Sequence, residues 1–402
     1  MKHMLSLFRS AAVLIMLGIF ALTARGVGFR LPNQDPEAIA RGNAFVATAD
    51  DPSAIYYNPA GITQLQGQNI RGGIYLLSAG VDYESPNGTK ASVNSDFVPV
   101  PQVYYVFSPE DFPLSFGLGV YAPYGLSLDW GPNTPFRTEA QKGRLSYLSI
   151  NPVVAWSILP NLSIGIGPTI NYSEASFEQG IGLLPGDSFK VRGSGWAYGF
   201  NAGIFWQPHP KWAFGINYRY QTDVEYNGSA ETLPSPPFPP STSANASIHF
   251  PQFVVGGVSF RPTTNWNFEF DLDWSDWDSV KQITINGTAF GSVVLPLNYR
   301  SSFMYEVGAT RQLGKGFFLS AGYFYSENSS PDKDFNPIIP DANLHLGSIG
   351  VGYKGKHWDF AVAYQFGYNP GREVTGDQSY PLANGTYHQF NNAINLAATF
   401  KF

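Results

Sequence analysis

From about residue 66 to the C-terminus, apolar and polar side chains alternate along the chain with a period of two. One apolar row, in KHWDFAVAYQFGY, consists of Trp358, Phe360, Val362, Tyr364, Phe366 and Tyr368, and another, in NNAINLAATFKF, of Ile394, Leu396, Ala398, Phe400 and Phe402. This alternation predicts β-strands with one apolar face. Aromatic residues at both ends of a row are typical of strands whose apolar face lies in a membrane.

Turn-forming residues divide this region into segments joined by alternately short and long connections. Six short connections are expected around residues 109–112, 160, 208–210, 262–263, 314–315 and 355–356. Seven longer, more polar ones are expected near residues 85–91, 127–141, 179–192, 227–243, 284–297, 329–340 and 370–387. Thirteen connections join fourteen strands, and short turns alternating with long loops are typical of outer-membrane barrels. We therefore predict an all-β fold, a transmembrane antiparallel β-barrel of about fourteen strands with both termini on the short-turn, periplasmic side.

Composition narrows the choice of fold. Phe, Trp and Tyr make up 16% of the 402 residues and charged residues only 13%, against roughly 25% charged residues in soluble proteins. A soluble β-sandwich would also alternate, but it rarely places an aromatic residue at nearly every second position of so many strands. The absence of cysteine excludes disulfides and thiolate metal sites, and no basic cluster offers a footprint for nucleic acid.

The first 26 residues have the pattern of a secretory signal peptide. Lys2 and Arg9 form a basic region, and residues 11–22 form an apolar stretch that is too short for a transmembrane helix. Residues 24–26, Ala-Arg-Gly, fit the small-x-small cleavage pattern, so we expect cleavage after Gly26. An N-terminal membrane anchor, the alternative, would need a longer apolar run.

Residues 27–65 break the alternating pattern and are expected to form a separate unit. The run Asp35-Pro36-Glu37 has the sequence of a helix start, and we expect a short helix from there to about Val46. The following stretch, ADDPSAIYYNPAG, has the period of neither a helix nor a strand. Because fourteen strands enclose a pore too wide for their own side chains to fill, we expect residues 27–65 to plug the lumen of a barrel formed by residues 66–402. Irregular backbone is tolerated at membrane depth when protein surrounds it.

The side chains expected to face the lumen mix scattered charges with apolar groups. Inward candidates are Asn217, Arg219, Glu269, Asp271, Asp273, Arg300, Met304, Glu306 and Asp359, with Phe205, Phe324 and several glycines among the apolar or small ones. Such a lumen suits a mostly apolar ligand better than a water-filled pore would. Arg219 and Arg300 are candidates to bind a ligand carboxylate, with Phe205 and Phe324 as apolar ligand contacts. The alternative is that each arginine pairs with an acid of the lumen.

Several stretches resemble a known family. The closest matches are ARGNAF and ADDPSAIYYNPAG, followed by PQVYYVF, FGLGVYAPYGL, LSINPVVAW and GFNAGIFW. They are similar to the N-terminal hatch and barrel strands of the FadL family, outer-membrane transporters of long-chain fatty acids and aromatic hydrocarbons. The resemblance covers nearly the whole chain. It implies a fourteen-stranded barrel, a hatch that shifts on ligand binding, and release of the ligand sideways into the membrane.

Two short runs in the plug are candidates for gating, Asp50-Asp51 and Asn58-Pro59-Ala60. From the sequence alone, the second run could be only a tight turn, whereas the resemblance implies a functional element of the hatch. If the two aspartates are buried, they need basic or hydrogen-bonding partners, and three arginines could serve: Arg41, Arg219 and Arg300.

A lateral opening is expected between the second and third strands. Pro99 and Pro101 lie in the second strand and Pro123 in the third, at about the same level. Proline gives the ladder no N–H and is normally kept out of the middle of sheets, and Gly117 and Gly119 let the backbone bend. A harmless bulge near the rim is the alternative. The resemblance favours an exit, because it implies release of ligand through a kinked third strand.

Together these features predict passive uptake of hydrophobic compounds, such as long-chain fatty acids or hydrocarbons, across a Gram-negative type of outer membrane. A porin-like channel for small polar solutes is the alternative. Expected partners are the hydrophobic substrate, outer-membrane lipid and lipopolysaccharide, and the barrel assembly machinery, whose recognition signal the terminal Phe402 resembles. We expect a monomer that binds no nucleic acid. His249 and His345 lie near external strand ends without an evident triad, so we expect no enzymatic activity, and no metal or cofactor.

Overall fold

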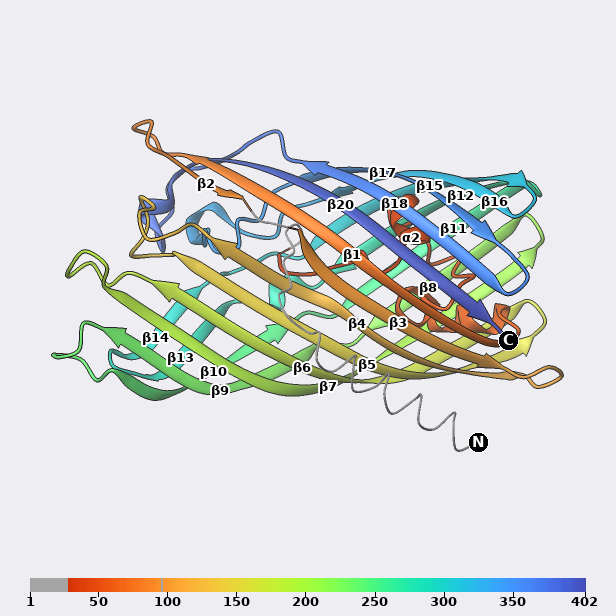
Figure 1. Cartoon of the computed structure of the whole chain (residues 1–402), viewed down its shortest axis with the longest axis horizontal. Coiled ribbons are helices and arrows are strands. Elements are labelled where there is room, and N and C mark those ends of the chain that lie inside the picture. Colours follow the sequence, from red (N-terminus) through yellow and green to blue (C-terminus); the bar gives the residue numbers. More distant parts are fainter. Residues whose placement is uncertain (1–27, 95–96) are drawn as a thin grey trace.

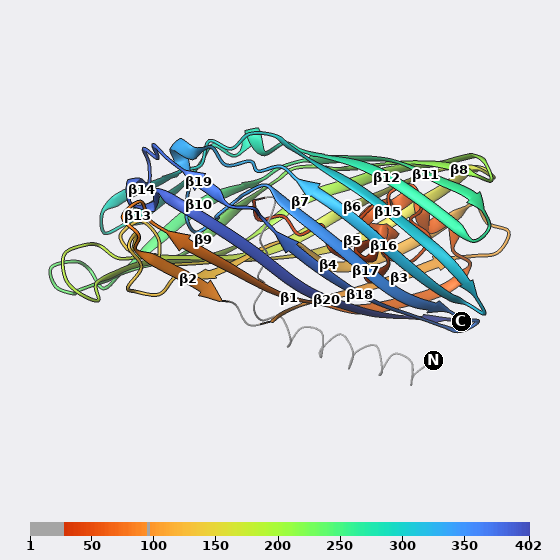
Figure 2. The same cartoon turned by 90° about the horizontal axis from the view of Figure 1, so that it is seen from above.

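The chain forms a closed antiparallel β-barrel of fourteen strands around a short irregular segment, as the computed structural model shows for residues 28–94 and 97–402 (Figures 1 and 2). The predicted fold class is therefore confirmed. The expected signal peptide lies outside the described residues. Within the described part of the chain, no helix is long and apolar enough to cross a membrane.

The wall consists of fourteen strands that follow one another in chain order. Two of these strands are interrupted, and each is divided into two elements. The strands are β1 (Gly67–Glu84), β3 (Val98–Ser108), β4 (Leu114–Asp129), β5 (Lys142–Leu159), β6 (Leu162–Gln179), β7 (Ser188–His209), β8 (Trp212–Arg219) with β9 (Thr222–Leu233), β10 (Ser241–Phe250) with β11 (Phe253–Thr263), β12 (Trp266–Ser275), β15 (Ser302–Gly314), β16 (Phe317–Ser326), β17 (Leu344–Lys354), β18 (Trp358–Tyr368) and β20 (Gly385–Lys401). Each strand pairs with its neighbours in sequence, and β1 pairs with β20 along nearly its whole length, which closes the barrel.

The period of two decides which side chains face the lumen. On β18 the aromatic and aliphatic row from Trp358 to Tyr368 is exposed on the outer face, while the residues between them are buried. The alternation changes phase at Tyr220–Gln221, between β8 and β9. The chain also leaves the ladder at Pro251–Gln252, between β10 and β11. Neither break is evident from the alternation alone.

The connections follow the predicted alternation, with one end of the barrel formed by short turns and the other by long loops. Two of the expected loops are largely strand, however. Residues 227–243 continue β9 and β10 as a hairpin beyond the wall, and residues 284–297 contain another hairpin. The smaller elements of the loops are β2 (Lys90–Asn94), η2 (Trp277–Ser279), β13 (Gln282–Thr288), β14 (Gly291–Pro296), η3 (Asp332–Asp334), β19 (Arg372–Val374) and η4 (Pro381–Ala383).

Residues 28–65, called the inner segment below, lie inside the barrel toward the short-turn end, near the C-terminus (Figure 1). They contain α2 (Pro36–Ala40), α3 (Ala54–Tyr57) and η1 (Pro59–Gln64). As expected, the Asp35 side chain caps α2 by accepting a hydrogen bond from Glu37 N. The expectation of a helix reaching Val46 is wrong, because Gly42 and Asn43 adopt positive φ angles of 61° and 64°, which end the helical turn.

Candidate functional site

Ion pairs tie the inner segment to the wall at β1 and β17. Arg71 on β1 contacts three buried carboxylates, Asp35 at 2.5 Å, Glu37 at 3.3 Å and Asp51 at 3.5 Å. Lys354 on β17 is partly exposed and contacts two, Glu37 at 3.1 Å and Asp50 at 3.4 Å. Loss of one partner from a buried pair typically costs about 3–5 kcal/mol, so the contacts of Arg71 hold the segment firmly, whereas the partly exposed pairs of Lys354 contribute less.

The gating candidates Asp50 and Asp51 are therefore paired with residues other than those expected. Asp51 also accepts hydrogen bonds from the backbone N–H and the hydroxyl of Ser53, at 2.8 and 2.6 Å. The expectation that Arg41, Arg219 or Arg300 serves as a partner is wrong, because Arg71 and Lys354 reach these carboxylates from the wall.

Three carboxylates on β12 hold the opposite side of the inner segment. Glu269 accepts hydrogen bonds from Ala47 N and Arg41 Nη2 (both 2.7 Å), Asp271 from Phe45 N and Val46 N (2.7 and 2.8 Å), and Asp273 from Arg30 Nη1 (2.8 Å). Their spacing of two residues places all three on the inward face of one strand. The polar lumen residues expected on β12 thus serve to bind protein rather than to line an open pore.

The Asn58-Pro59-Ala60 run docks against β6 and β7. The Asn58 amide donates to Ile204 O on β7 at 2.9 Å and to Val46 O at 2.8 Å, and its oxygen accepts from Ala60 N at 3.2 Å. The run is therefore a turn, and it is also a bridge between two parts of the inner segment and the barrel wall.

Inward-facing glycines give the inner segment room to approach the wall. A Cβ atom at Gly322 on β16 would lie 2.0 Å from Arg41 C, and one at Gly215 on β8 would lie 2.0 Å from Val46 O. By contrast, a Cβ atom at Gly256 on β11 or Gly347 on β17 would have nothing within 4 Å. The first two glycines are thus needed for docking, whereas the other two offer matched controls.

Alanine at Gly215 and Gly322 is expected to loosen the inner segment without unfolding the barrel. Each substitution places a side chain against backbone, an overpacking that costs about 1–3 kcal/mol. Since about 1.4 kcal/mol is tenfold in an equilibrium constant, the double variant should show at least about tenfold more frequent channel openings in planar bilayers. The Gly256→Ala, Gly347→Ala double variant should behave as the parent does, and equal conductance of the two variants would contradict docking through the glycines.

The ladder between β3 and β4 is short. It runs from the pair Phe107–Phe116 only to the pair Val103–Val120, and beyond this pair the two strands do not bond to one another. Gly117 and Gly119 lie in the paired part. Pro99 and Pro101 lie on β3 beyond the paired part, and Pro123 lies beside it at a bulge of β4. The strands β3 and β4 thus share no backbone hydrogen bonds near these prolines, where the sequence predicted an opening in the wall.

The start of the inner segment bonds to the edge of β4 that β3 leaves. Leu31 N donates to Pro123 O at 2.8 Å, and Gly125 N donates to Phe29 O at 2.9 Å. Arg30 and Tyr124 form an antiparallel bridge between these bonds. Residues 29–31 therefore satisfy backbone groups of an unpaired strand edge and lie directly behind the gap in the wall.

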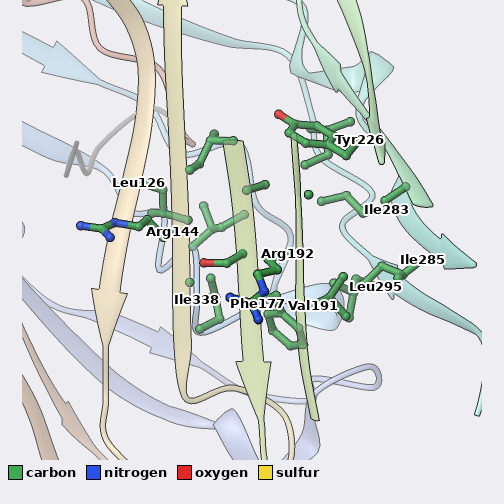
Figure 3. A pocket seen from close by; sticks show the side chains of 18 of the residues that line it. Leu126, Arg144, Phe177, Val191, Arg192, Tyr226, Ile283, Ile285, Leu295 and Ile338 are labelled. Carbon is green, nitrogen blue, oxygen red and sulfur yellow. The ribbon is translucent and has the colours of Figure 1, made fainter. Parts of the chain in front are cut away.

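An apolar cavity lies on the long-loop side of Phe29. Its empty volume is about 860 Å³, part of it open to solvent, and its lining includes Leu126, Tyr226, Ile283, Leu295 and Ile338 (Figure 3). The hydroxyl of Tyr226 is hydrogen-bonded to Ser173 at 2.6 Å, so this ring offers the cavity mainly its apolar surface. Figure 3 shows the Arg144 side chain pointing away from the cavity. Such a lining suits an apolar ligand.

Arg219 is a buried cation with no carboxylate within ion-pair distance among the described residues. Its Nη2 donates to the Tyr121 hydroxyl at 2.6 Å, and its Nε has no hydrogen-bond partner. The guanidinium lies 5.2, 5.4 and 5.8 Å from the ring centres of Tyr56, Tyr121 and Phe253. Because buried charges are normally paired, this guanidinium is suited to receive an anionic oxygen beside the β3–β4 gap.

The other ligand-contact candidates are placed differently. The expectation that Arg300 faces the lumen is wrong, since it is exposed in the connection before β15, where residues 297–301 have left the alternating pattern. Phe205 packs with Ala60 and Ala213, and Phe324 belongs to the large apolar cluster that includes Phe29. Neither phenylalanine lines the apolar cavity.

Loops cover the lumen at the long-loop end. Residues 329–342 fold inward, and Asp341 accepts a hydrogen bond from Gly28 N at 3.3 Å, which connects this loop to the inner segment. Glu139 accepts one from Leu382 N at 3.0 Å, and burial raises the pKa of this carboxyl to about 7. A ligand that reaches the cavity from this end must displace or pass between these loops.

Three residues that hold the inner segment are not singled out by the sequence: Arg30, Arg71 and Lys354. The alternation of β1 offers a signal for Arg71, because it occupies an inward position among buried neighbours such as Asn69 and Tyr75. In the described part of the chain, no group of three or more acidic or histidine residues is arranged to hold a metal ion. The Nδ1 atoms of His249 and His345 are hydrogen-bonded to Asp223 and to the Tyr323 hydroxyl.

The chain is similar to known proteins both in sequence and in structure. Residues 18–402 match the model of the family described as outer membrane protein transport protein (OMPP1/FadL/TodX). The long-chain fatty acid transport protein of Salmonella typhi is 20% identical over 405 residues, which cover 90% of this chain and 92% of the relative. A FadL homologue from Pseudomonas aeruginosa has a similar structure, with a TM-score of 0.82, 19% identity and coverage of 93% of this chain and all of the other. The toluene transporter TodX of P. putida has a TM-score of 0.72 at 17% identity, with coverage of 95% and 99%.

Proposed function

Because the chain belongs to the outer membrane protein transport family (OMPP1/FadL/TodX), we propose that it carries hydrophobic compounds, such as long-chain fatty acids or hydrocarbons, passively across the outer membrane. The observation that supports this most directly is the apolar cavity behind the loops, which ends at the inner segment. The named relatives transport fatty acids and toluene. In this orientation the long loops face outward and both termini face the periplasm.

The proposed route runs from the apolar cavity to the gap between β3 and β4. Phe29 lines the cavity, and its neighbours Arg30 and Leu31 bond to β4 at the gap. These residues therefore separate the cavity from the gap, and their displacement would connect the two. In this proposal the inner segment moves when ligand binds, and the ligand leaves sideways into the membrane near Pro101 and Val120.

Oleate uptake tests the proposed function and the role of Arg219 together. Cells that lack their own fatty-acid transporter should take up labelled oleate when they carry this protein. Arg219→Gln should lower the initial rate of oleate uptake about tenfold, because one charge-assisted hydrogen bond is worth about 1.5–3 kcal/mol, and should leave uptake of hexadecane within about twofold. Arg300→Gln, which changes an exposed arginine, is the matched control. Absence of oleate and hexadecane uptake by the unaltered protein would refute the proposed function.

A channel for small polar solutes is the second candidate, and a polar cavity favours it. This cavity lies near the short turns, has about 710 Å³ of empty volume, and is lined by Glu37, Arg41, Asp50, Arg261 and Lys354 among others. Sugar-induced swelling of liposomes at a rate typical of porins, without oleate uptake, would support this second function.

We also propose that Phe402 is an assembly signal. Its backbone exchanges hydrogen bonds with Gln68, at 3.0 and 3.1 Å, where the last strand meets the first, and its ring is exposed on the outer face. Deletion of Phe402 should lower the heat-modifiable folded fraction in the outer membrane several-fold. Phe402→Ala separates the ring from the backbone bonds, and Phe402→Tyr should assemble normally; an unchanged folded fraction in all three variants would count against the signal.

A further inference from the structure

The wall has a second interruption, between β5 and β6. The ladder stops after the pair Ile150–Ile170 and resumes at the pair Val154–Ile166. The register is the same on both sides, so Pro152 faces Pro168 in the unpaired stretch. Neither proline has an N–H to offer, and unsatisfied backbone carbonyls are costly in a membrane.

The side chain of Asn151 fills this interruption from the inside. Its amide nitrogen lies 2.9 Å from Pro168 O and 3.4 Å from Pro152 O, and the residue is fully buried. A Cβ atom at Gly167 would lie 2.3 Å from Pro152 O and 2.8 Å from the Asn151 amide. The absence of a side chain at Gly167 therefore leaves the space in which the Asn151 amide replaces the missing ladder.

Asn151 is also the meeting point of the inner segment and the proposed exit. Its oxygen accepts from the Tyr121 hydroxyl at 2.7 Å, and this hydroxyl accepts from Arg219 at 2.6 Å. Its amide donates to Asn201 at 3.1 Å, and Asn201 donates to Ile55 O of the inner segment at 2.8 Å. The break in the wall thus lies close to the inner segment, and an asparagine held by three elements closes it.

The outer side of the break continues into apolar surface. Val154 and Ile166, the first pair after the interruption, belong to a groove of about 1030 Å³ of empty volume on the wall, with Trp156, Ile204 and Ile216. A hydrophobic molecule that passed the break would therefore meet an apolar surface, as it would at a membrane exit.

We propose that the β5–β6 interruption is a second, latent opening in the barrel wall, and that Asn151 is the latch that keeps it shut. This inference rests on the proposed function, because it concerns the way out for the same hydrophobic ligand. Asn151 thereby directs the ligand to the β3–β4 gap. It acts on transport by holding the wall, and it is a positioning residue.

The test uses a barrel whose β3–β4 gap is closed by a crosslinker between cysteines at Pro101 and Val120, which lie on the outward face of the two strands. With the crosslink in place, labelled oleate should not be taken up. Asn151→Ala, and Asn151→Asp, which keeps the size but removes both N–H donors, should raise uptake at least about fivefold above the crosslinked parent. Adding Pro152→Val and Pro168→Val should lower uptake again, because both residues then supply N–H groups to the ladder. Asn171→Ala, a change at a buried asparagine that does not bond to either proline, is the control.

Each outcome decides between the claims. If the unaltered barrel takes up no oleate, the proposed function fails. If both Asn151 variants fold, as judged by heat modifiability, and remain at the crosslinked level, the latch is refuted. If the crosslinked parent still transports and the two valine substitutions alone stop it, the second opening is used without a latch, which also overturns the inference.

Discussion

Removal of residues 27–65 is expected to leave a barrel that inserts into the membrane and conducts ions without closing. Every strand of the wall pairs with both neighbours over at least part of its length, and β1 bonds to β20 without help from the inner segment. The residues that hold this segment, such as Arg71 and the β12 carboxylates, would face water after its removal and would no longer need buried partners. In planar bilayers the truncated barrel should show a steady conductance many times that of the full chain, with no closures.

The glycine variants provide the control for this truncation. Gly215→Ala with Gly322→Ala should produce intermittent openings of the same conductance, because the segment is present but loosely docked. If the truncated barrel folds, as judged by heat modifiability, and stays as closed as the full chain, then the inner segment is not the plug, and the loops at residues 329–342 are the next candidate.

The barrel itself could be predicted from the sequence, because its determinants are local and repeated. Alternation fixes which face of each strand is apolar, and turn-forming residues fix the number of strands. The sequence does not predict the breaks at Tyr220–Gln221 and Pro251–Gln252. At each break the inward-facing positions change from odd to even residue numbers or the reverse within one or two residues, and the aromatic residues on either side hide this change in the alternation. The side chains of residues 227–243 are polar on both faces and therefore predict a loop, whereas the structure forms a long hairpin there.

The contacts of the inner segment could be predicted only in part. The sequence predicts that Asp50 and Asp51 need partners if they are buried and that the β12 acids face the lumen, but the choice of Arg71 and Lys354 as partners depends on how the segment is rotated within the lumen. No local pattern carries that rotation. Arg300 illustrates the same limit, because the strand expected from residue 298 begins only at Ser302, which leaves Arg300 exposed in the connection before it. The contact of Asn151 with Pro168 could not be predicted, because it depends on the register of β5 against β6. That register is known only once the two strands are paired.

A crosslink between β3 and β4 is expected to stop uptake of oleate and hexadecane, because it joins the strands where their ladder ends. The last pair is Val103–Val120, and Pro101, two residues beyond Val103 on the same outward face of β3, lies diagonally across from Val120. Cysteines at Pro101 and Val120, the only two in an otherwise cysteine-free chain, can be bridged by a short, reducible thiol-reactive crosslinker. Uptake should fall at least tenfold on crosslinking, and reduction of the crosslinker should restore it.

The crosslink must act through the gap and not through general rigidity. A matched pair, Val307→Cys with Tyr323→Cys, joins β15 and β16 at paired positions on the outer face, where the ladder is intact. This second crosslink should leave uptake within about twofold of the reduced protein. If the β3–β4 crosslink also leaves uptake unchanged, the ligand leaves elsewhere, and the bonds of residues 29–31 to β4 then serve only to fill the gap in the wall. If it blocks uptake while the control does not, those bonds must break on every transport event, since they occupy the edge along which the ligand passes.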